Sequence, residues 1–208
     1  MNILIIDDHT IIRRGIRNLL TERYPSARIR EGSSLEEAER SMTTEAPEVA
    51  ILDLLLGDGN TLDHLVNWRT RFPQVRLLIY SMMPEHLYAE RVISLGCAGF
   101  LSKQGPEQEL LQALEVILSG QVYASEDLKR TMRGSGDNGV KNPLKDLSDR
   151  EIVVMHDLLQ DLGIKEISQR MDISPSTVAT YKARLFDKLG IGSVTELHRW
   201  ARIHGIGG

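Results

Sequence analysis

Three carboxylates, one hydroxyl and one ammonium group stand at the ends of short apolar segments of this 208-residue sequence. Asp7 and Asp8 follow NILII, Asp53 follows VAIL, Ser81 follows RLLIY, and Lys103 follows GFLS. Carboxylates brought together repel one another, so a divalent cation bound between them would stabilise the group. Mg²⁺ suits such a group because it takes hard oxygen ligands and keeps water or phosphate oxygens in its other positions. A carboxylate beside Mg²⁺ can attack a phosphoryl group, while a lysine and the metal offset the developing charge.

The apolar segments belong to an alternating pattern that would bring their ends together. Five β-rich runs at 2–7, 27–32, 49–54, 75–81 and 99–103 alternate with helical periodicities at 10–23, 34–44, 61–71, 85–95 and 106–119. Such alternation predicts a parallel sheet covered by helices on both faces. In these sheets, ligands bind at the carboxyl ends of the strands. The first half is therefore predicted to be an α/β domain with a flavodoxin-like, doubly wound, five-stranded parallel sheet.

The second half predicts a small all-α domain. Helical patterns at 148–160, 163–171, 174–189 and 194–204 follow one another without a convincing strand. Ser148 and Glu151 form a capping-box pattern at the first of them, and Ser174-Pro175 marks the start of the third. A glycine-rich polar stretch separates the halves and is typical of a linker. We expect domains at 1–123 and 144–208, joined by a linker at 124–143.

Composition and charge exclude several classes of protein. The sequence is 41% hydrophobic and 26% charged, with a net charge of −4, which is typical of a globular chain. No apolar run reaches the roughly 18 residues of a membrane span, and the start of the chain does not resemble a signal peptide. Cys97 is the one cysteine, so neither an internal disulfide nor a CxxC metal site can form. We expect a cytoplasmic protein with no membrane partner.

The acidic residues and the lysine together resemble the receiver domain of two-component response regulators. Each residue alone has an ordinary explanation, such as a turn aspartate or a surface lysine, but all of them occur in order on consecutive strand ends. The resemblance implies that Asp53 is the phosphoacceptor, that Asp7, Asp8, Asp53 and the backbone carbonyl of Leu55 bind Mg²⁺, and that Ser81, Lys103 and Phe100 contact the phosphate or act in the switch.

The sequence departs from the receiver pattern at three positions. Gly57 stands where the family usually has proline, Thr61 where it usually has glycine, and Gln104 where proline often follows the lysine. These departures concern the loop after the third strand and the peptide after Lys103, so they leave the geometry of switching open. An enzyme working through an aspartyl-phosphate is a competing interpretation. It is disfavoured because such hydrolases usually carry a second aspartate where this chain has Leu55.

The stretch LSDREIVVMHDLLQDLGIKEISQRMDISPSTVATYKARLFDKLGI resembles the LuxR-type helix-turn-helix. With the receiver it indicates the NarL/FixJ class, and TYKxRL at 180–185 suggests its BvgA/EvgA-like branch. Residues 143–208 carry 9 Lys and Arg against 9 Asp and Glu, so contact with DNA must depend on local charge. The helix at 174–189 supplies it, with three cations against one acid. The DNA contacts that we expect are Lys165, Ser176, Thr177, Thr180, Tyr181, Lys182, Ala183, Arg184 and Lys188.

These resemblances imply a transcription regulator rather than an enzyme. The implied partners are a histidine kinase as phosphodonor, double-stranded DNA, and a second copy of the chain upon activation. One alternative stays open, in which the chain binds DNA independently of phosphorylation and the receiver serves as a dimerisation scaffold.

Overall fold

The computed structural model describes residues 1–126, 128–129 and 142–206. The chain divides into two compact units, Met1–Gly139 and Val140–Gly208. The domain limits expected from the sequence stay a prediction, because most of the expected linker at 124–143 lies outside the described residues. No helix in the described ranges is both long enough and apolar enough to cross a membrane.

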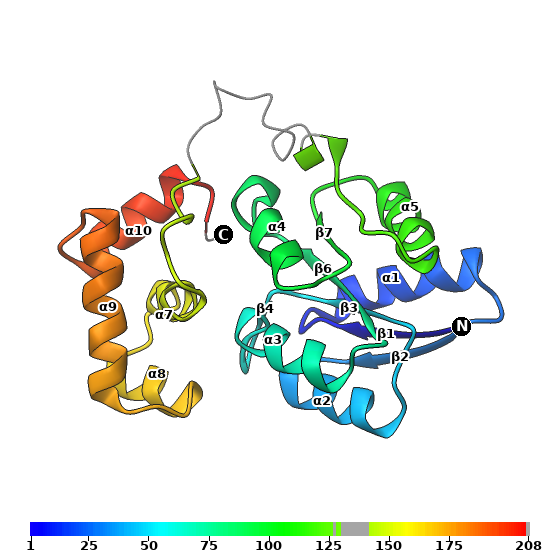
Figure 1. Ribbon diagram of the computed structural model, residues 1–208, viewed down its shortest axis with the longest axis horizontal. Helices are drawn as coiled ribbons and strands as arrows, with labels where there is room; N and C mark the ends of the chain where they lie inside the picture. The colour runs from blue at the N-terminus through cyan, green and yellow to red at the C-terminus, as the bar shows by residue number, and fades with distance from the viewer. Residues whose placement is uncertain (127, 130–141, 207–208) are drawn as a thin grey trace. The chain divides into compact units, whose positions relative to one another are not determined.

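The first unit is a five-stranded parallel sheet with the order β2-β1-β3-β6-β7, which confirms the flavodoxin-like prediction (Figure 1). Its strands are β1 (Asn2–Ile6), β2 (Arg28–Gly32), β3 (Val49–Leu52), β6 (Arg76–Ser81) and β7 (Gly99–Ser102). Its helices are α1 (Thr10–Arg23), α2 (Leu35–Thr44), α3 (Leu62–Arg71), α4 (Glu85–Ser94) and α5 (Glu107–Leu118). The observed strands end up to two residues earlier than the apolar runs, which is the usual uncertainty of element ends.

Alternation of buried side chains along the strands builds a core on each side of the sheet. Ile3 and Ile5 of β1 pack with Ile51 of β3 against α1 and α5, which cover one face. Leu4 and Ile6 are equally buried and point to the other face, where Figure 1 shows α2, α3 and α4. Both faces of β1 are therefore apolar, as its uninterrupted hydrophobic sequence requires.

A short hairpin follows β3 and was not expected from the sequence. It consists of β4 (Leu55–Leu56) and β5 (Gly59–Asn60), paired antiparallel. Asp58 in its turn accepts the backbone N–H of Leu35, the first residue of α2, at 2.8 Å. This contact fastens the loop to the positive end of a neighbouring helix.

The second unit contains the helices α7 (Asp149–Leu159), α8 (Ile164–Arg170), α9 (Pro175–Leu189) and α10 (Val194–Ile203). Ser148 and Glu151 form the capping box that the sequence predicts, and the Ser174 side chain accepts the N–H of Thr177 at the start of α9. Gly190 ends α9 in the left-handed conformation at φ 65°, which glycine adopts without a Cβ clash. The all-α prediction is confirmed.

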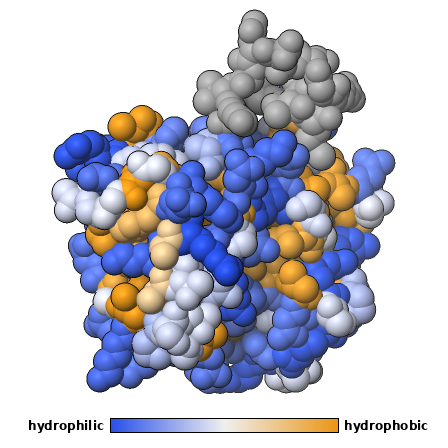
Figure 2. Space-filling model, turned by 60° about the vertical axis from the view of Figure 1, so that its left-hand side comes forward, coloured by the Kyte–Doolittle hydropathy of each residue, from blue (hydrophilic) through white to orange (hydrophobic). Residues whose placement is uncertain are grey.

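On the face drawn in Figure 2, hydrophobic residues are interspersed among hydrophilic ones.

Candidate functional site: the carboxyl edge of the sheet and the exposed face of α9

The backbone ladder of the sheet carries the polar residues to one edge. Beyond the last strand residues, the N–H of Asp7 donates to Gly32 O at 3.2 Å, and the N–H of Asp53 donates to Ile6 O at 2.8 Å. The N–H of Lys103 donates in the same way to Ser81 O at 2.8 Å. Because these bonds continue the register of the strands, the side chains project from adjacent positions at the carboxyl edge.

Lys103 bridges two of the carboxylates. Its Nζ lies 2.5 Å from Asp7 Oδ2 and 2.5 Å from Asp53 Oδ2. The Lys103 side chain is 2% exposed, and Asp7 and Asp53 are 1% and 5% exposed. Water does not screen these buried charges. Each charge therefore depends on its ion-pair partner for stabilisation.

The balance of charge in this pocket is negative. Burial raises the pKa of Asp53 above its ordinary value, against the lowering effect of the Lys103 ammonium. Burial lowers the pKa of Lys103, but the Asp53 and Asp7 carboxylates outweigh it and hold this pKa above its ordinary value. One ammonium thus serves two buried carboxylates, and Asp8 adds a third beside them. A surplus of negative charge on hard oxygen atoms favours a divalent cation.

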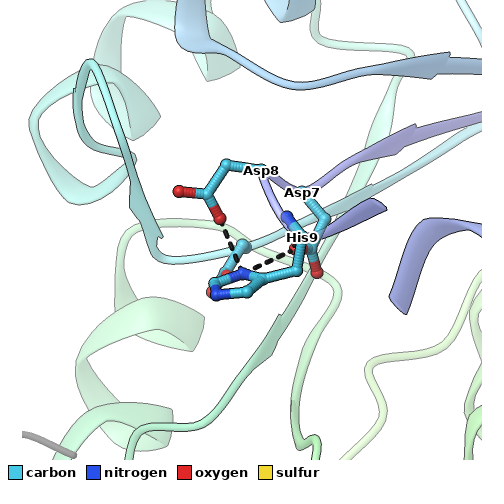
Figure 3. A group of neighbouring side chains, drawn as sticks. Asp7, Asp8 and His9 are labelled. Carbon is cyan, nitrogen blue, oxygen red and sulfur yellow. Dashed lines mark hydrogen bonds and ion pairs between the residues drawn. The ribbon is translucent and has the colours of Figure 1, made fainter. Parts of the chain in front are cut away.

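Asp8 and His9 complete the open side of the pocket. Figure 3 shows the His9 ring turned toward both neighbouring carboxylates. His9 Nδ1 lies 2.7 Å from Asp8 Oδ1 and 3.3 Å from Asp7 Oδ1. Asp7, Asp8, His9 and Asp53 each offer one ligand atom, and these atoms lie within 4.8 Å of one another.

The loop after Asp53 is tied back to it at two points. The Leu54 N–H donates to Asp53 Oδ1 at 2.7 Å, and the Thr61 hydroxyl donates to Asp53 O at 2.6 Å. Thr61 is buried, as is Leu54, whereas Leu55 and Gly57 are partly or fully exposed. The threonine in place of the usual glycine therefore makes a side-chain contact that a glycine does not have.

Ser81 and Phe100 are both buried. Ser81 is the last residue of β6, and its hydroxyl oxygen accepts the Met83 N–H at 3.4 Å. Burial raises the pKa of the Asp53 carboxyl, and the nearby Ser81 side chain is one of the groups that lower it. Phe100 lies within β7 with no exposed surface. The structure thus brings Ser81 and Lys103 to Asp53, whereas Phe100 belongs to the core.

His9 and Arg13 at this edge were not predicted from the sequence, and Thr61 was noted only as a departure from the family pattern. Arg13 donates from Nη1 to the Asp7 carbonyl oxygen at 2.5 Å. His9 follows the two aspartates directly, and that adjacency is a signal that could have found it. Neither Arg13 nor Thr61 carries such a signal, because helical spacing and loop position do not show which backbone oxygen a side chain reaches.

The outer face of α9 is the second candidate site. Val178 and Leu185 are buried, as the helical spacing predicts, and Leu189 is partly buried. Six of the expected contact residues are exposed, namely Lys165, Ser176, Thr180, Ala183, Arg184 and Lys188, and three are partly buried, namely Thr177, Tyr181 and Lys182. All except Lys165, which lies on α8, are on α9.

The two lysines of α9 have different surroundings. Lys182 Nζ lies 5.3 Å from the centre of the Phe186 ring, one helical turn further along the same helix. Lys188 Nζ instead lies 2.7 Å from Glu151 Oε2, and Glu151 is 2% exposed. Burial raises the pKa of Glu151, but Lys188 and Ser148 outweigh it and hold this pKa below its ordinary value. Lys188 therefore also joins α9 to the cap of α7.

Comparisons with known proteins agree over both units. Residues 3–115 match the response regulator receiver domain, and residues 145–201 match the bacterial regulatory proteins of the luxR family. The response regulator UvrY of Escherichia coli K12 is 30% identical, with 99% of this chain and 95% of UvrY covered. The response regulator GacA of Pseudomonas syringae pv. syringae is 27% identical, with 99% of this chain and 97% of GacA covered.

A solved structure of RcsB from Salmonella enterica serovar Typhimurium has the same fold. That protein was bound to promoter rprA in the presence of the phosphomimetic BeF3-. It superposes with a TM-score of 0.78 at 24% identity and covers 96% of this chain and 97% of RcsB. Taken together, the receiver match, the luxR-family match and the similarity to UvrY show that this chain belongs to the response regulators of the NarL/FixJ class, which are phosphorylation-controlled transcription regulators and not enzymes.

Proposed function

We propose that Asp53 accepts a phosphoryl group from a histidine kinase and that this modification controls binding of the second unit to double-stranded DNA. The observation that carries the proposal is the position of Asp53, which is buried beside Lys103 at the carboxyl edge of the sheet. Asp8 lies at the open side beside His9, and Asp7 accepts the His9 N–H through Oδ1 and contacts Lys103 through Oδ2. We assign Asp53, which directly follows β3, the central strand of the sheet, as the nucleophile.

The donor set of the pocket fits Mg²⁺. We propose Asp7, Asp8, Asp53 and the backbone carbonyl of Leu55 as its ligands. Support comes from the grouping of acidic oxygens within 4.8 Å and from the surplus negative charge on them. A bound Mg²⁺ would supply charge neutralisation for the phosphate oxygens.

The transfer itself needs little from the protein beyond positioning and charge. An Asp53 carboxylate oxygen forms the new bond to phosphorus, and the bond from phosphorus to the donor's imidazole nitrogen breaks. The donor histidine leaves with the electron pair of that bond. Lys103 is placed to neutralise an oxygen of the transferring group, since its Nζ already lies 2.5 Å from Asp53 Oδ2.

We propose that Ser81, Lys103 and Phe100 take part in the structural change that follows phosphorylation of Asp53. Ser81 is the last residue of β6, at the carboxyl edge of the sheet that also carries Asp53, and we propose that its hydroxyl moves to a phosphate oxygen. Phe100 is fully buried, and a change of its rotamer would have to repack the surrounding core. Thr61 holds the carbonyl of Asp53, which ties the loop after β3 to the modified residue.

Phosphorylation at a single residue is the first expected result. Incubation with acetyl phosphate and Mg²⁺ should add one phosphoryl group to the wild-type chain and none to Asp53→Asn, measured by intact mass. Asp58→Asn is the matched control, because Asp58 lies in the same loop but caps α2. It should be modified like the wild type, and equal modification of Asp53→Asn would overturn the assignment.

The DNA-binding surface that we propose is the exposed face of α9 together with Lys165 of α8. Its contact residues are Lys165, Ser176, Thr177, Thr180, Tyr181, Lys182, Ala183, Arg184 and Lys188. One recognition helix reads few base pairs, so we propose homodimers on half-sites about one helical turn apart. The RcsB structures support this, since one contains two RcsB dimers bound to two parallel DNAs.

Replacing each of the two lysines of α9 should distinguish an effect on DNA affinity from an effect on the stability of the second unit. Lys182→Ala is expected to weaken all duplexes alike and to lower the slope of log affinity against log salt by about 0.9 for each phosphate that the lysine neutralises. Lys188→Ala should in addition lower the stability of the second unit by about 1 kcal/mol, because buried Glu151 loses an ion-pair partner. Salt-dependent anisotropy titrations and thermal melts measure the two effects. A salt slope unchanged by Lys182→Ala would contradict the surface proposed here.

Two finer assignments complete the proposal. The TYKxRL pattern at 180–185 supports a place in the BvgA/EvgA-like branch of the class. Because a histidine kinase would supply the phosphoryl group and DNA is the target, we propose that the protein acts in the cytoplasm.

A further inference from the structure

His9 lies at the acidic pocket but has no part in the function proposed above. Its backbone N–H donates to Asp7 Oδ1 at 2.9 Å, and its ring contacts the Asp8 carboxylate through Nδ1. His9 is the N-cap residue of α1, yet its side chain makes no capping hydrogen bond. The imidazole is therefore turned toward the carboxylates and not toward the helix (Figure 3).

His9 Nδ1 forms hydrogen-bond or ion-pair contacts with both aspartates, and the same distances fit neighbouring ligands of one metal ion. Two ligand atoms at adjacent corners of an octahedron, each about 2.1 Å from the ion, lie about 3.0 Å apart. His9 Nδ1 lies 2.7 Å from Asp8 Oδ1 and 3.3 Å from Asp7 Oδ1, on either side of that value. The pocket thus places a nitrogen atom beside its carboxylates, close enough to bind the same cation.

A nitrogen donor changes which cation a site prefers. Carboxylates, carbonyls and water suit Mg²⁺, whereas imidazole favours later divalent ions such as Co²⁺, Ni²⁺ and Zn²⁺. We propose that His9 Nδ1 is a ligand of the metal site. It would raise the affinity of the site for Co²⁺, Ni²⁺ and Zn²⁺ relative to its affinity for Mg²⁺. This inference rests on the proposed function, because it concerns the same pocket.

Calorimetric titration of the full-length chain with Co²⁺ and with Mg²⁺ tests this assignment. His9→Ala should weaken Co²⁺ binding by about tenfold or more, as loss of an interaction with a metal site does. It should leave Mg²⁺ affinity within about twofold, because Mg²⁺ draws its affinity from oxygen ligands. Asparagine is a favourable N-cap residue, and His9→Asn replaces the ring nitrogen by an amide oxygen as the possible ligand. It should therefore bind Mg²⁺ like the wild type and Co²⁺ like His9→Ala.

His198→Ala is the matched control. His198 also pairs with an aspartate, with Nε2 3.2 Å from Asp161 Oδ1, but it lies outside the acidic pocket. This variant should bind both cations like the wild type. An equal loss of Mg²⁺ and Co²⁺ affinity in His9→Ala, or unchanged Co²⁺ affinity, would overturn the proposed role of His9. The metal site of the proposed function would still stand. If the wild-type chain binds neither cation, the metal site of the proposed function fails with it.

Discussion

Replacing Lys103 with methionine is expected to lower the free energy of unfolding of the metal-free receiver unit by about 3–5 kcal/mol at neutral pH. The reason is that the lysine ammonium lies 2.5 Å from both Asp7 Oδ2 and Asp53 Oδ2, with all three side chains buried. Methionine keeps the length and the apolar stem but removes the charge. Two buried carboxylates would then face each other without a counter-ion.

A double-mutant cycle shows whether the loss comes from the carboxylates. Asp53→Asn should recover much of the stability lost in Lys103→Met, since residues of one ion-pair network couple. Lys129→Met removes a lysine from an exposed pair with Glu126 and should cost at most about 1 kcal/mol. Urea unfolding is followed through buried Trp68 in a Trp200→Phe background, which reports on the receiver unit alone. A destabilisation by Lys103→Met no larger than that by Lys129→Met would contradict the charge balance described above.

The stability difference between Lys103→Met and the wild type should depend on pH in a definite direction. Burial already raises the pKa of Asp53, so the folded state binds more protons than the unfolded state when pH lies between the two pKa values. Removing Lys103 should raise this pKa further, and the deficit of the variant should shrink as pH falls through it. At the alkaline end, the Lys103 pKa is raised in the folded wild type. Its contribution is therefore complete below the ordinary lysine value and is lost as pH rises through the folded one.

The sheet and its acidic edge could be predicted because each strand is an apolar run with a polar residue directly after it. Strand ends of a parallel sheet meet at one edge whatever the rest of the chain does. Asp53 and Lys103 are 50 residues apart, yet their meeting follows from topology alone. The hairpin at Leu55–Leu56 and Gly59–Asn60 could not be predicted, since strands of two residues have no periodicity.

The finer contacts depend on side-chain rotamers and on partners distant in the sequence. The capping box of Ser148 and Glu151 was visible in the sequence, whereas the ion pair of Glu151 with Lys188, 37 residues further along, was not. Helical spacing placed Lys188 on α9 without showing that a buried acid engages it. Thr61 looked like a departure from the family pattern, and only the fold shows that its hydroxyl holds the Asp53 carbonyl.

Phosphorylation is expected to tighten binding to a specific duplex by about tenfold or more, within the range of couplings between distinct sites in proteins. The physical reason is dimerisation. If the receivers pair on phosphorylation, the second recognition helix binds from a high effective concentration. The gain should vanish on a duplex that carries one half-site, because only one α9 can then be placed on specific bases.

The most direct measurement is the affinity of the full-length chain for a duplex selected in vitro, at one fixed salt concentration, with and without Mg²⁺ and BeF3-. Anisotropy titration gives the affinity, and sedimentation under the same conditions gives the assembly state. We predict that BeF3- raises both affinity and dimer formation in the wild type and changes neither in Asp53→Asn. Equal affinity and assembly of the wild type in both conditions, or an equal response of Asp53→Asn, would contradict control of DNA binding through Asp53.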